Sequence, residues 1–256
     1  VEAIILANVR TPAERLGDIR AQVAANRRAV ERMLGLARKY GTDELLRIMD
    51  AVLDYSEAMM RQALAALPDG DAGFADIIDG DGVIDQGDTA DRTFRLQLAL
   101  RKRGDTIAAD FAGSDPAVPG PMNAPLSVTA SGVYAALKMI LDPNSLIPPN
   151  SGCWRPVTVT APPGSVVNAQ EPSPVVYANH EMSHRVSEMV FAAMHAITPD
   201  RVLAGSQGTS GITTFGGLDY RTGQRFVSYE STKGGFGARP VKGVLFTGQP
   251  GTGKTH

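Results

Sequence analysis

The sequence predicts an α+β fold in which a helical hairpin packs on a mixed or antiparallel β-sheet, together with further helices and glycine-rich loops. Two long segments of helical periodicity follow one another near the start of the chain. The candidate strands that come later are joined by short turns, as in hairpins. Helices therefore occur in a block and strands in hairpins, which favours α+β over a wound parallel sheet.

Composition excludes several classes of protein. The chain has 256 residues and a formal net charge of −2, so no charge excess attracts nucleic acid or an acidic membrane surface. No apolar run approaches the ~20 residues that span a bilayer. The single cysteine, Cys153, leaves no intrachain disulfide and fits a reducing compartment, so we expect a cytoplasmic protein. The chain begins without methionine, and we expect it to be a piece of something longer.

The first 70 residues are expected to form a strand and a helical hairpin. Residues 1–6 are mostly apolar and favour a strand. Thr11-Pro12 then predicts a helix start, because proline is tolerated at the first helical position, and Gly41 predicts the end of that helix. Thr42 caps a second long helix, which the breaker Pro68-Asp69-Gly70 ends.

The arginines of the first helix are interpreted as an ordinary solvated face. Acidic residues alternate with them along the helix, as is typical of an exposed surface rather than of a nucleic-acid interface. No nucleic-acid partner is therefore expected. The arginines are Arg20, Arg27, Arg28, Arg32 and Arg38, and the acids are Glu14, Asp18 and Glu31.

The region from residue 71 to residue 242 is expected to form the α+β core, continuous with the first 70 residues. Strands are predicted at 94–100, 106–111, 157–160 and 226–229, and a helix at 127–141. An acidic stretch, 76–91, precedes them. Its residues Asp79, Asp81 and Asp85 are spaced like calcium ligands. However, Val83 and Ile84 stand where a calcium loop needs an oxygen ligand and a glycine. We therefore expect a turn between strands.

The stretch from residue 174 to residue 190 carries the clearest candidate site. Residues 175–177 form an apolar extended run, and a helical period begins at Asn179, a good N-cap residue. Free N–H groups and the helix dipole favour anions at such a helix start. Polar residues gather in the first turn and a half, namely His180, Glu181, His184 and Arg185.

Three interpretations of this stretch remain open. His180-Glu181-x-x-His184 matches the zinc-hydrolase pattern, in which two imidazoles at i and i+4 share a metal beside a glutamate base. No third ligand is evident in the sequence. The polar residues can instead be a structural helix cap or a cluster that faces a substrate.

The glycine-rich stretches 205–217 and 234–237 have two interpretations. Their backbone N–H groups can cradle a phosphate, or the glycines can serve tight turns. Arg239 follows the second stretch and can hold a carboxylate or phosphate with two hydrogen bonds. Cys153 is interpreted as a small buried residue and not as a nucleophile.

The last residues, 243–256, look foreign to the rest of the chain and resemble the start of an AAA-type ATPase. Gly248, Gly253, Lys254 and Thr255 match the P-loop pattern. A P-loop needs the helix that follows it, and only one residue follows Thr255. We therefore expect no nucleotide binding by this segment.

Several separated segments, in this order, resemble the hydantoinase B/oxoprolinase family, and especially the B-type subunits of N-methylhydantoinase and caprolactamase-like enzymes. No single segment is decisive, and the order of all of them makes the resemblance specific. The segments are residues 10–26, 110–136, 150–170, 206–209 with 214–217, and 229–240.

The resemblance implies one part of an ATP-dependent hetero-oligomeric hydrolase. An A-type partner subunit would bind ATP and activate the substrate by phosphorylation, and the B-type chain would open the activated cyclic amide with water. Acetone carboxylase-like members would instead carboxylate a ketone. The family also implies a divalent metal, held by a His/Asp cluster that we expect before Val1.

The resemblance also implies roles for particular residues. The family has a pattern like G-N-x-E-x-S-x-R, which Asn179, Glu181, Ser183 and Arg185 fit, with Ala178 in place of the glycine. Glu181 would be the general base or would orient water, beside Asn179. Arg185 and Arg239 would hold the anionic activated group. His180 and His184 would be bystanders. A non-catalytic scaffold or interface module remains the alternative from another class.

Overall fold

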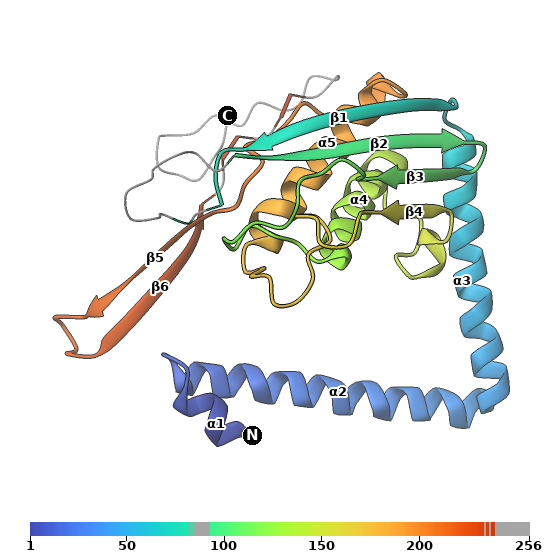
Figure 1. Cartoon of the computed structure of the whole chain (residues 1–256). Helices are drawn as coiled ribbons and strands as arrows, with labels where there is room; N and C mark the ends of the chain where they lie inside the picture. Colours follow the sequence, from blue (N-terminus) through green and yellow to red (C-terminus); the bar gives the residue numbers. More distant parts are fainter. Residues whose placement is uncertain (82, 84–92, 233, 236, 239–256) are drawn as a thin grey trace. The chain divides into compact units, whose positions relative to one another are not determined.

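The computed structural model describes residues 1–81, 83, 93–232, 234–235 and 237–238 (Figure 1). It divides into two compact units. The first comprises Val1–Val52 and Ile212–Ser231. The second comprises Leu53–Gly211 and the described residues from Thr232 onward.

The first unit is built from helices and one β-hairpin. It contains α1 (Glu2–Ala7), α2 (Pro12–Tyr40) and the beginning of α3 (Thr42–Ala65). Its hairpin consists of β5 (Gly211–Leu218) and β6 (Arg225–Thr232). The helix start at Pro12 and the strand at residues 226–229 are confirmed. The second helix also begins where predicted, but Thr42 is its first residue and not its cap.

The strand predicted at residues 1–6 is wrong, because this segment forms α1. An apolar run becomes a strand only when a neighbouring strand takes up its backbone hydrogen bonds. Here the bonds are made locally, such as the bond from Ile5 N–H to the Val1 carbonyl (3.1 Å). The Glu, Ala and Leu side chains of this segment are good helix formers.

The predicted helical hairpin is also not formed. Gly41 alone separates α2 from α3, whereas two antiparallel helices need a loop of about two to five residues to reverse the chain. Gly41 has a φ of +83°, which suits glycine. Figure 1 shows α2 and the beginning of α3 running in different directions.

The arginine-rich face of α2 is solvated, as predicted. No residue of α2 is buried in this structure. Arg15 pairs with Asp18 (2.8 Å) and Arg28 with Glu31 (3.2 Å), and all four side chains are about half exposed or more. Such exposed pairs contribute little to stability.

The second unit is organised around a four-stranded sheet in the order β1-β2-β3-β4. β1 (Gly70–Ile78) and β3 (Thr106–Asp110) both pair antiparallel with β2 (Phe94–Arg103), and β4 (Val157–Thr160) pairs parallel with β3. The sheet is therefore mixed. The hairpin of β2 and β3 and the strand β4 are confirmed. β1 was not predicted, because its Gly70-to-Ala75 sequence lacks the usual β-branched residues.

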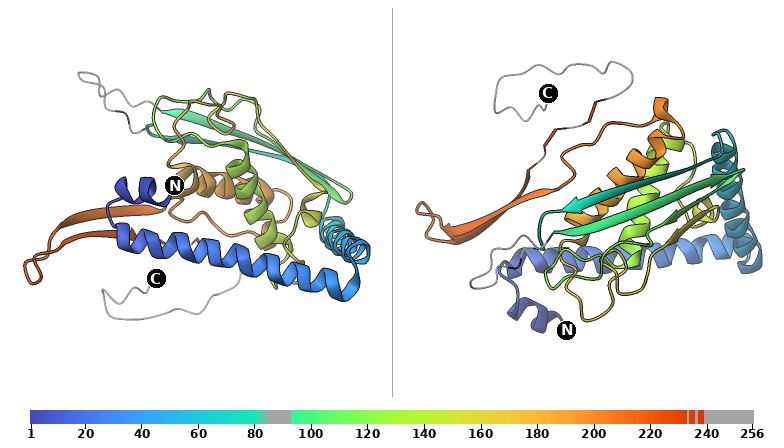
Figure 2. Two further views of the ribbon diagram at one scale, coloured as in Figure 1. Left: turned by 90° about the horizontal axis from the view of Figure 1, so that it is seen from below. Right: turned by 45° about the horizontal axis from the view of Figure 1, so that its top comes forward.

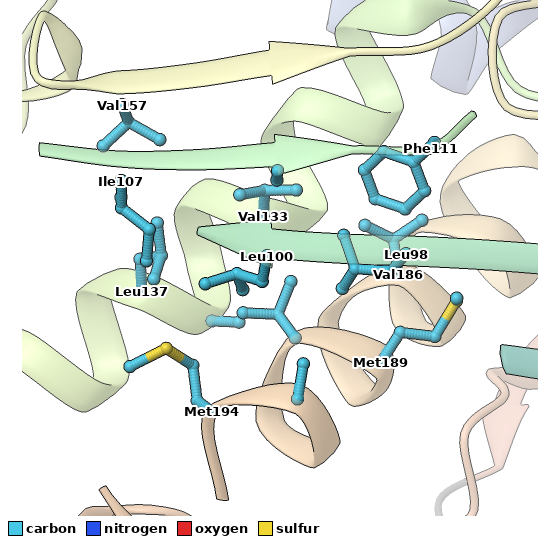
Figure 3. Close-up of a cluster of buried hydrophobic side chains, with 14 of the residues drawn as sticks. Leu98, Leu100, Ile107, Phe111, Val133, Leu137, Val157, Val186, Met189 and Met194 are labelled. Carbon is cyan, nitrogen blue, oxygen red and sulfur yellow. The ribbon is translucent and has the colours of Figure 1, made fainter. Parts of the chain in front are cut away.

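Two helices cover one face of this sheet. α4 (Leu126–Leu141) and α5 (Ser183–His195) lie side by side beneath the strands (Figure 1; Figure 2). Along β2, every second side chain is buried. Figure 3 shows Leu98 and Leu100 of β2 facing the buried side chains of both helices.

A glycine allows α4 and α5 to approach closely. A Cβ atom added to Gly132 would lie 2.9 Å from the Ser183 carbonyl oxygen. The Ser187 hydroxyl of α5 donates to the Gly132 carbonyl (2.9 Å) across the same contact. The beginning of α5, which carries the candidate site, is thus held against α4.

Short helices complete the second unit. η1 (Gly152–Trp154) contains Cys153, which is fully buried, as predicted. Its thiol donates to the Asn150 carbonyl (3.0 Å). A π-helical turn, η2 (Ala178–Met182), leads into α5, and η3 (Pro199–Arg201) follows it. Among the described residues, no helix is both long and apolar enough to cross a bilayer.

Asp142 ends α4 in a buried cluster. Its carboxylate pairs with Lys138 and accepts hydrogen bonds from the N–H groups of Leu146 and Ile147 (both 2.8 Å). Burial raises the pKa of Asp142, but the hydrogen bonds from Lys138, Ile147 and Leu146 outweigh this effect, so the pKa lies below its ordinary value of 3.8.

The cluster predicts acid sensitivity. Because the folded pKa of Asp142 lies below its unfolded value, this carboxylate stabilises the fold fully above pH 3.8, and the contribution is lost as pH falls through the folded pKa. We expect Asp142→Asn to lower the free energy of unfolding at about pH 5 more than at about pH 3. Urea denaturation at both values measures the difference. The exposed Asp200→Asn is the control, and equal losses at both values would contradict the assignment.

Candidate functional site

The candidate site lies where α5 begins. Val175, Val176 and Tyr177 form a turn and not the predicted strand, because the Ala178 N–H bonds to the Val175 carbonyl (3.1 Å). Asn179 is not an N-cap either. It lies inside the π-helical turn, and Tyr177 takes the capping position without a side-chain hydrogen bond.

The apolar face of η2 and α5 packs on the core, and this packing orients their polar face. Met182, Val186, Met189 and Val190 are fully buried against the core. The other face carries Glu181, His184, Arg185 and Glu188, and it meets a glycine-rich segment, residues 204–211, which we call the strap. Both belong to the second unit.

The strap is attached to α5 by hydroxyl groups. The Thr209 hydroxyl donates to Glu181 Oε1 (2.5 Å), and Ser206 donates to Glu188 Oε1 from both its hydroxyl (2.7 Å) and its N–H (3.1 Å). Ser210 Oγ lies 3.0 Å from His184 Nε2. The interpretation of residues 205–217 as a loop is therefore only half right. The first half is the strap, and the second half is the strand β5.

Glu181 is half-buried and well oriented. Its Oε1 accepts the Thr209 bond, whereas Oε2 has no hydrogen-bond partner among the described residues. One carboxylate oxygen is thus held and the other is available. This arrangement suits a proton acceptor, because a carboxylate that is already oriented loses less conformational entropy when it binds water or substrate.

Arg185 lies between the sheet and the strap. Its guanidinium donates to Asp76 Oδ2 of β1 (3.1 Å). Gly208 of the strap is buried beside the guanidinium, and its φ of +68° suits glycine. The predicted anion-binding residue therefore already has one carboxylate partner.

The other predicted site residues lie apart from this arrangement. Asn179 is exposed, and its backbone carbonyl accepts a hydrogen bond from the Ser183 hydroxyl (2.9 Å). Arg239 and the P-loop residues Gly248, Gly253, Lys254 and Thr255 lie outside the described residues. A hollow of about 460 Å³ lies beside α1 and α2 in the first unit, and none of the predicted site residues lines it.

The described residues do not fit a metal site. No group of three His, Cys, Asp or Glu side chains among them is arranged to hold an ion. His184 bonds to Ser210, and the His180 ring meets the edge of the Tyr177 ring at a centroid distance of 6.4 Å. His180 and His184 thus lack a third ligand in this part of the chain, and no chemical step is derived through a metal.

Of the three residues spaced like calcium ligands, Asp79 and Asp81 are described, and Asp85 lies outside the described residues. Asp81 is buried, and its carboxylate accepts from the N–H groups of Val83 and Gly120 (both 3.0 Å). This residue therefore ties its loop to the loop before α4, in keeping with the predicted turn.

Sequence reasoning missed Asn123, which positions the start of α5. Asn123 is fully buried, and its side-chain amide donates to the carbonyls of Val118, Gly120 and Pro174. Its Oδ1 accepts the Val118 N–H (2.7 Å). All polar atoms of this buried amide thus have hydrogen-bond partners, as buried polar groups usually do. The bond from Asn123 to Pro174 joins segments that are 51 residues apart in the chain. Nothing local in the sequence signals such a link.

The strap was also missed as a partner of α5. The sequence gives one indication of this contact, because three residues with hydroxyl groups lie between its glycines, namely Ser206, Thr209 and Ser210. The distance along the chain hid it, because Thr209 meets Glu181 across 28 residues.

A comparison with sequence models of known protein families identifies the class to which this protein belongs. The model for Hydantoinase B/oxoprolinase matches residues 1–252, and the chain belongs to this family. The match extends into the segment 243–256 that looked foreign. The family predicted from the sequence is confirmed.

Two relatives are about 30% identical to this chain over the aligned residues. A protein of Pseudomonas sp. (strain NS671), named as the B-type component of a D-/L-hydantoinase, is 32% identical over 207 residues, which cover 79% of this chain and 34% of that protein. 5-Oxoprolinase 1 of Arabidopsis thaliana is 30% identical over 236 residues, which cover 89% of this chain and 17% of that protein. The chain thus spans about a third or less of these relatives.

Solved structures share the fold. The ATP-dependent caprolactamase from Pseudomonas jessenii superposes with a TM-score of 0.68 and 27% identity, over 86% of this chain and 36% of that chain. A nucleotide-free acetone carboxylase superposes with a TM-score of 0.65 and 15% identity, over 77% of this chain and 27% of that chain, which shows the fold alone. The predicted α+β class is confirmed.

Proposed function

We propose that this chain is part of the B-type subunit of an ATP-dependent hydrolase of cyclic amides. The family membership supports this proposal, as do the relatives named for hydantoin, oxoproline and caprolactam chemistry. The observation that carries it furthest in this chain is the carboxylate of Glu181, which the strap orients through Thr209.

In the proposed reaction, a nucleotide-binding A-type partner binds ATP and activates the cyclic amide by phosphorylation. Water then attacks the activated carbon, and Glu181 Oε2 takes a proton from that water. The ring C–N bond breaks, and the nitrogen leaves with the proton that Glu181 had taken up. The phosphoryl group stays on the acyl oxygen at this step and leaves as inorganic phosphate when a second water hydrolyses the acyl phosphate to the carboxylate. Arg185 holds the anionic group in this proposal.

A second candidate is a subunit of an ATP-dependent ketone carboxylase. The likeness to acetone carboxylase favours it on fold alone. In both candidate reactions, ATP activates the carbonyl group of the substrate. The hydrolase then adds water to that substrate, whereas the carboxylase adds a carboxyl group.

A substrate panel distinguishes the two. The full-length subunit with its partner is incubated with ATP and hydantoin, 5-oxoproline, caprolactam or acetone. Ring opening of one cyclic amide that depends on ATP supports the proposal. Consumption of acetone that depends on both ATP and bicarbonate would establish the carboxylase instead. Absence of turnover on all four would contradict both assignments.

A further inference from the structure

His184 and Ser210 form a hydroxyl–imidazole pair that the proposed function does not use. Ser210 Oγ lies 3.0 Å from His184 Nε2. This distance lies within the range, about 2.6–3.2 Å, at which a nucleophile hands its proton to a base. Both side chains reach the surface, where a small molecule can approach them.

The pair is held from both sides. The Ser210 N–H donates to the His180 carbonyl (3.1 Å), which attaches the backbone of the strap to the turn before α5. The next residue, Gly211, accepts a hydrogen bond from the Thr232 hydroxyl (2.9 Å). On the helix side, the fully buried Val186 fixes the first turns of α5. The hydroxyl and the ring are thus held at a short distance.

A neighbouring pair of residues attaches the strap beside His184 and Ser210. Thr209 precedes Ser210, and it holds the carboxylate of Glu181, which lies about one helical turn before His184. Glu188, one turn further along, is engaged by Ser206.

We propose that Ser210 and His184 are a nucleophile–base pair that accepts an acyl group from an activated ester. Ser210 Oγ bonds to the acyl carbon and its proton passes to His184 Nε2. The bond between the acyl carbon and the leaving oxygen breaks, and that oxygen takes the proton as it departs. Water, deprotonated by His184, then releases the carboxylic acid and restores Ser210. The reaction needs neither ATP nor a partner subunit, so it is independent of the proposed function.

The test uses p-nitrophenyl acetate and the full chain without ATP. We expect p-nitrophenol release and an acetyl group on Ser210, located by peptide mass spectrometry. His184→Gln, which keeps a polar side chain, is expected to slow acetylation of Ser210 about 100-fold, because general-base help contributes at least that much in enzymes.

Two further variants make the result specific. Ser210→Ala should remove the adduct, whereas Ser206→Ala should leave it, since Ser206 has the same hydroxyl on the same strap but bonds to Glu188. Circular dichroism confirms that each variant is folded. The proposal is overturned if Ser210 carries no acetyl group while lysines do, or if His184→Gln leaves its rate of acetylation unchanged.

Discussion

Gly152→Ala is expected to destabilise the chain by about 3 kcal/mol, at the upper end of the overpacking range. A Cβ atom at this position would lie 2.1 Å from the Leu53 carbonyl oxygen and 2.7 Å from Leu53 Cα. These are backbone atoms inside α3, so neither side can yield without breaking the packing of η1 on that helix. The urea midpoint, followed by far-UV circular dichroism, measures the effect.

The matched control for this prediction is Gly17→Ala in α2. No atom lies within 4 Å of the added Cβ, and alanine is the better helix former by up to about 1 kcal/mol, so this variant should be neutral or slightly stabilised. A Gly152→Ala chain that unfolds at the same urea concentration as the parent would mean that η1 does not pack on α3.

Glu181→Gln is expected to lower the turnover number of the full complex by a factor of about 10² to 10⁴, the usual contribution of a general base. Glutamine keeps the shape and can still accept the Thr209 hydrogen bond, but it cannot take a proton from water. The Michaelis constant for the cyclic amide should change little, because the loss arises in the transition state. ATP-coupled substrate hydrolysis is the measurement.

Glu188→Gln is the control, since this carboxylate lies seven residues further along, in α5, and also accepts a hydroxyl bond from the strap. We expect it to retain turnover. If Glu181→Gln also retains turnover, Glu181 has no catalytic role, and the chain becomes a scaffold whose chemistry is done elsewhere in the complex.

The sequence was most informative where structure is local. Pro12 and Gly41 bound α2, and the short turn at Gly104-Asp105 joins β2 to β3, because dihedral preferences act within a few residues. The burial of Cys153 and the helix at residues 126–141 follow from composition and periodicity in the same way.

Predictions failed where an apolar run needed a distant partner. Residues 1–6 and 175–177 have strand-like composition, but neither pairs with another strand. β1, in contrast, becomes a strand despite its glycine and aspartate residues, because β2 offers a complete edge from Phe94 to Lys102.

For this protein, the sequence alone determined the family, the α+β class and the group of polar residues at the start of α5, since these depend on residue order and short-range spacing. Only the tertiary structure decided what those polar residues touch. Glu181 meets Thr209, Arg185 meets Asp76, and His184 meets Ser210. These contacts join segments 26 to 109 residues apart, and they arise because packing of α5 on the core turns its polar face toward the strap.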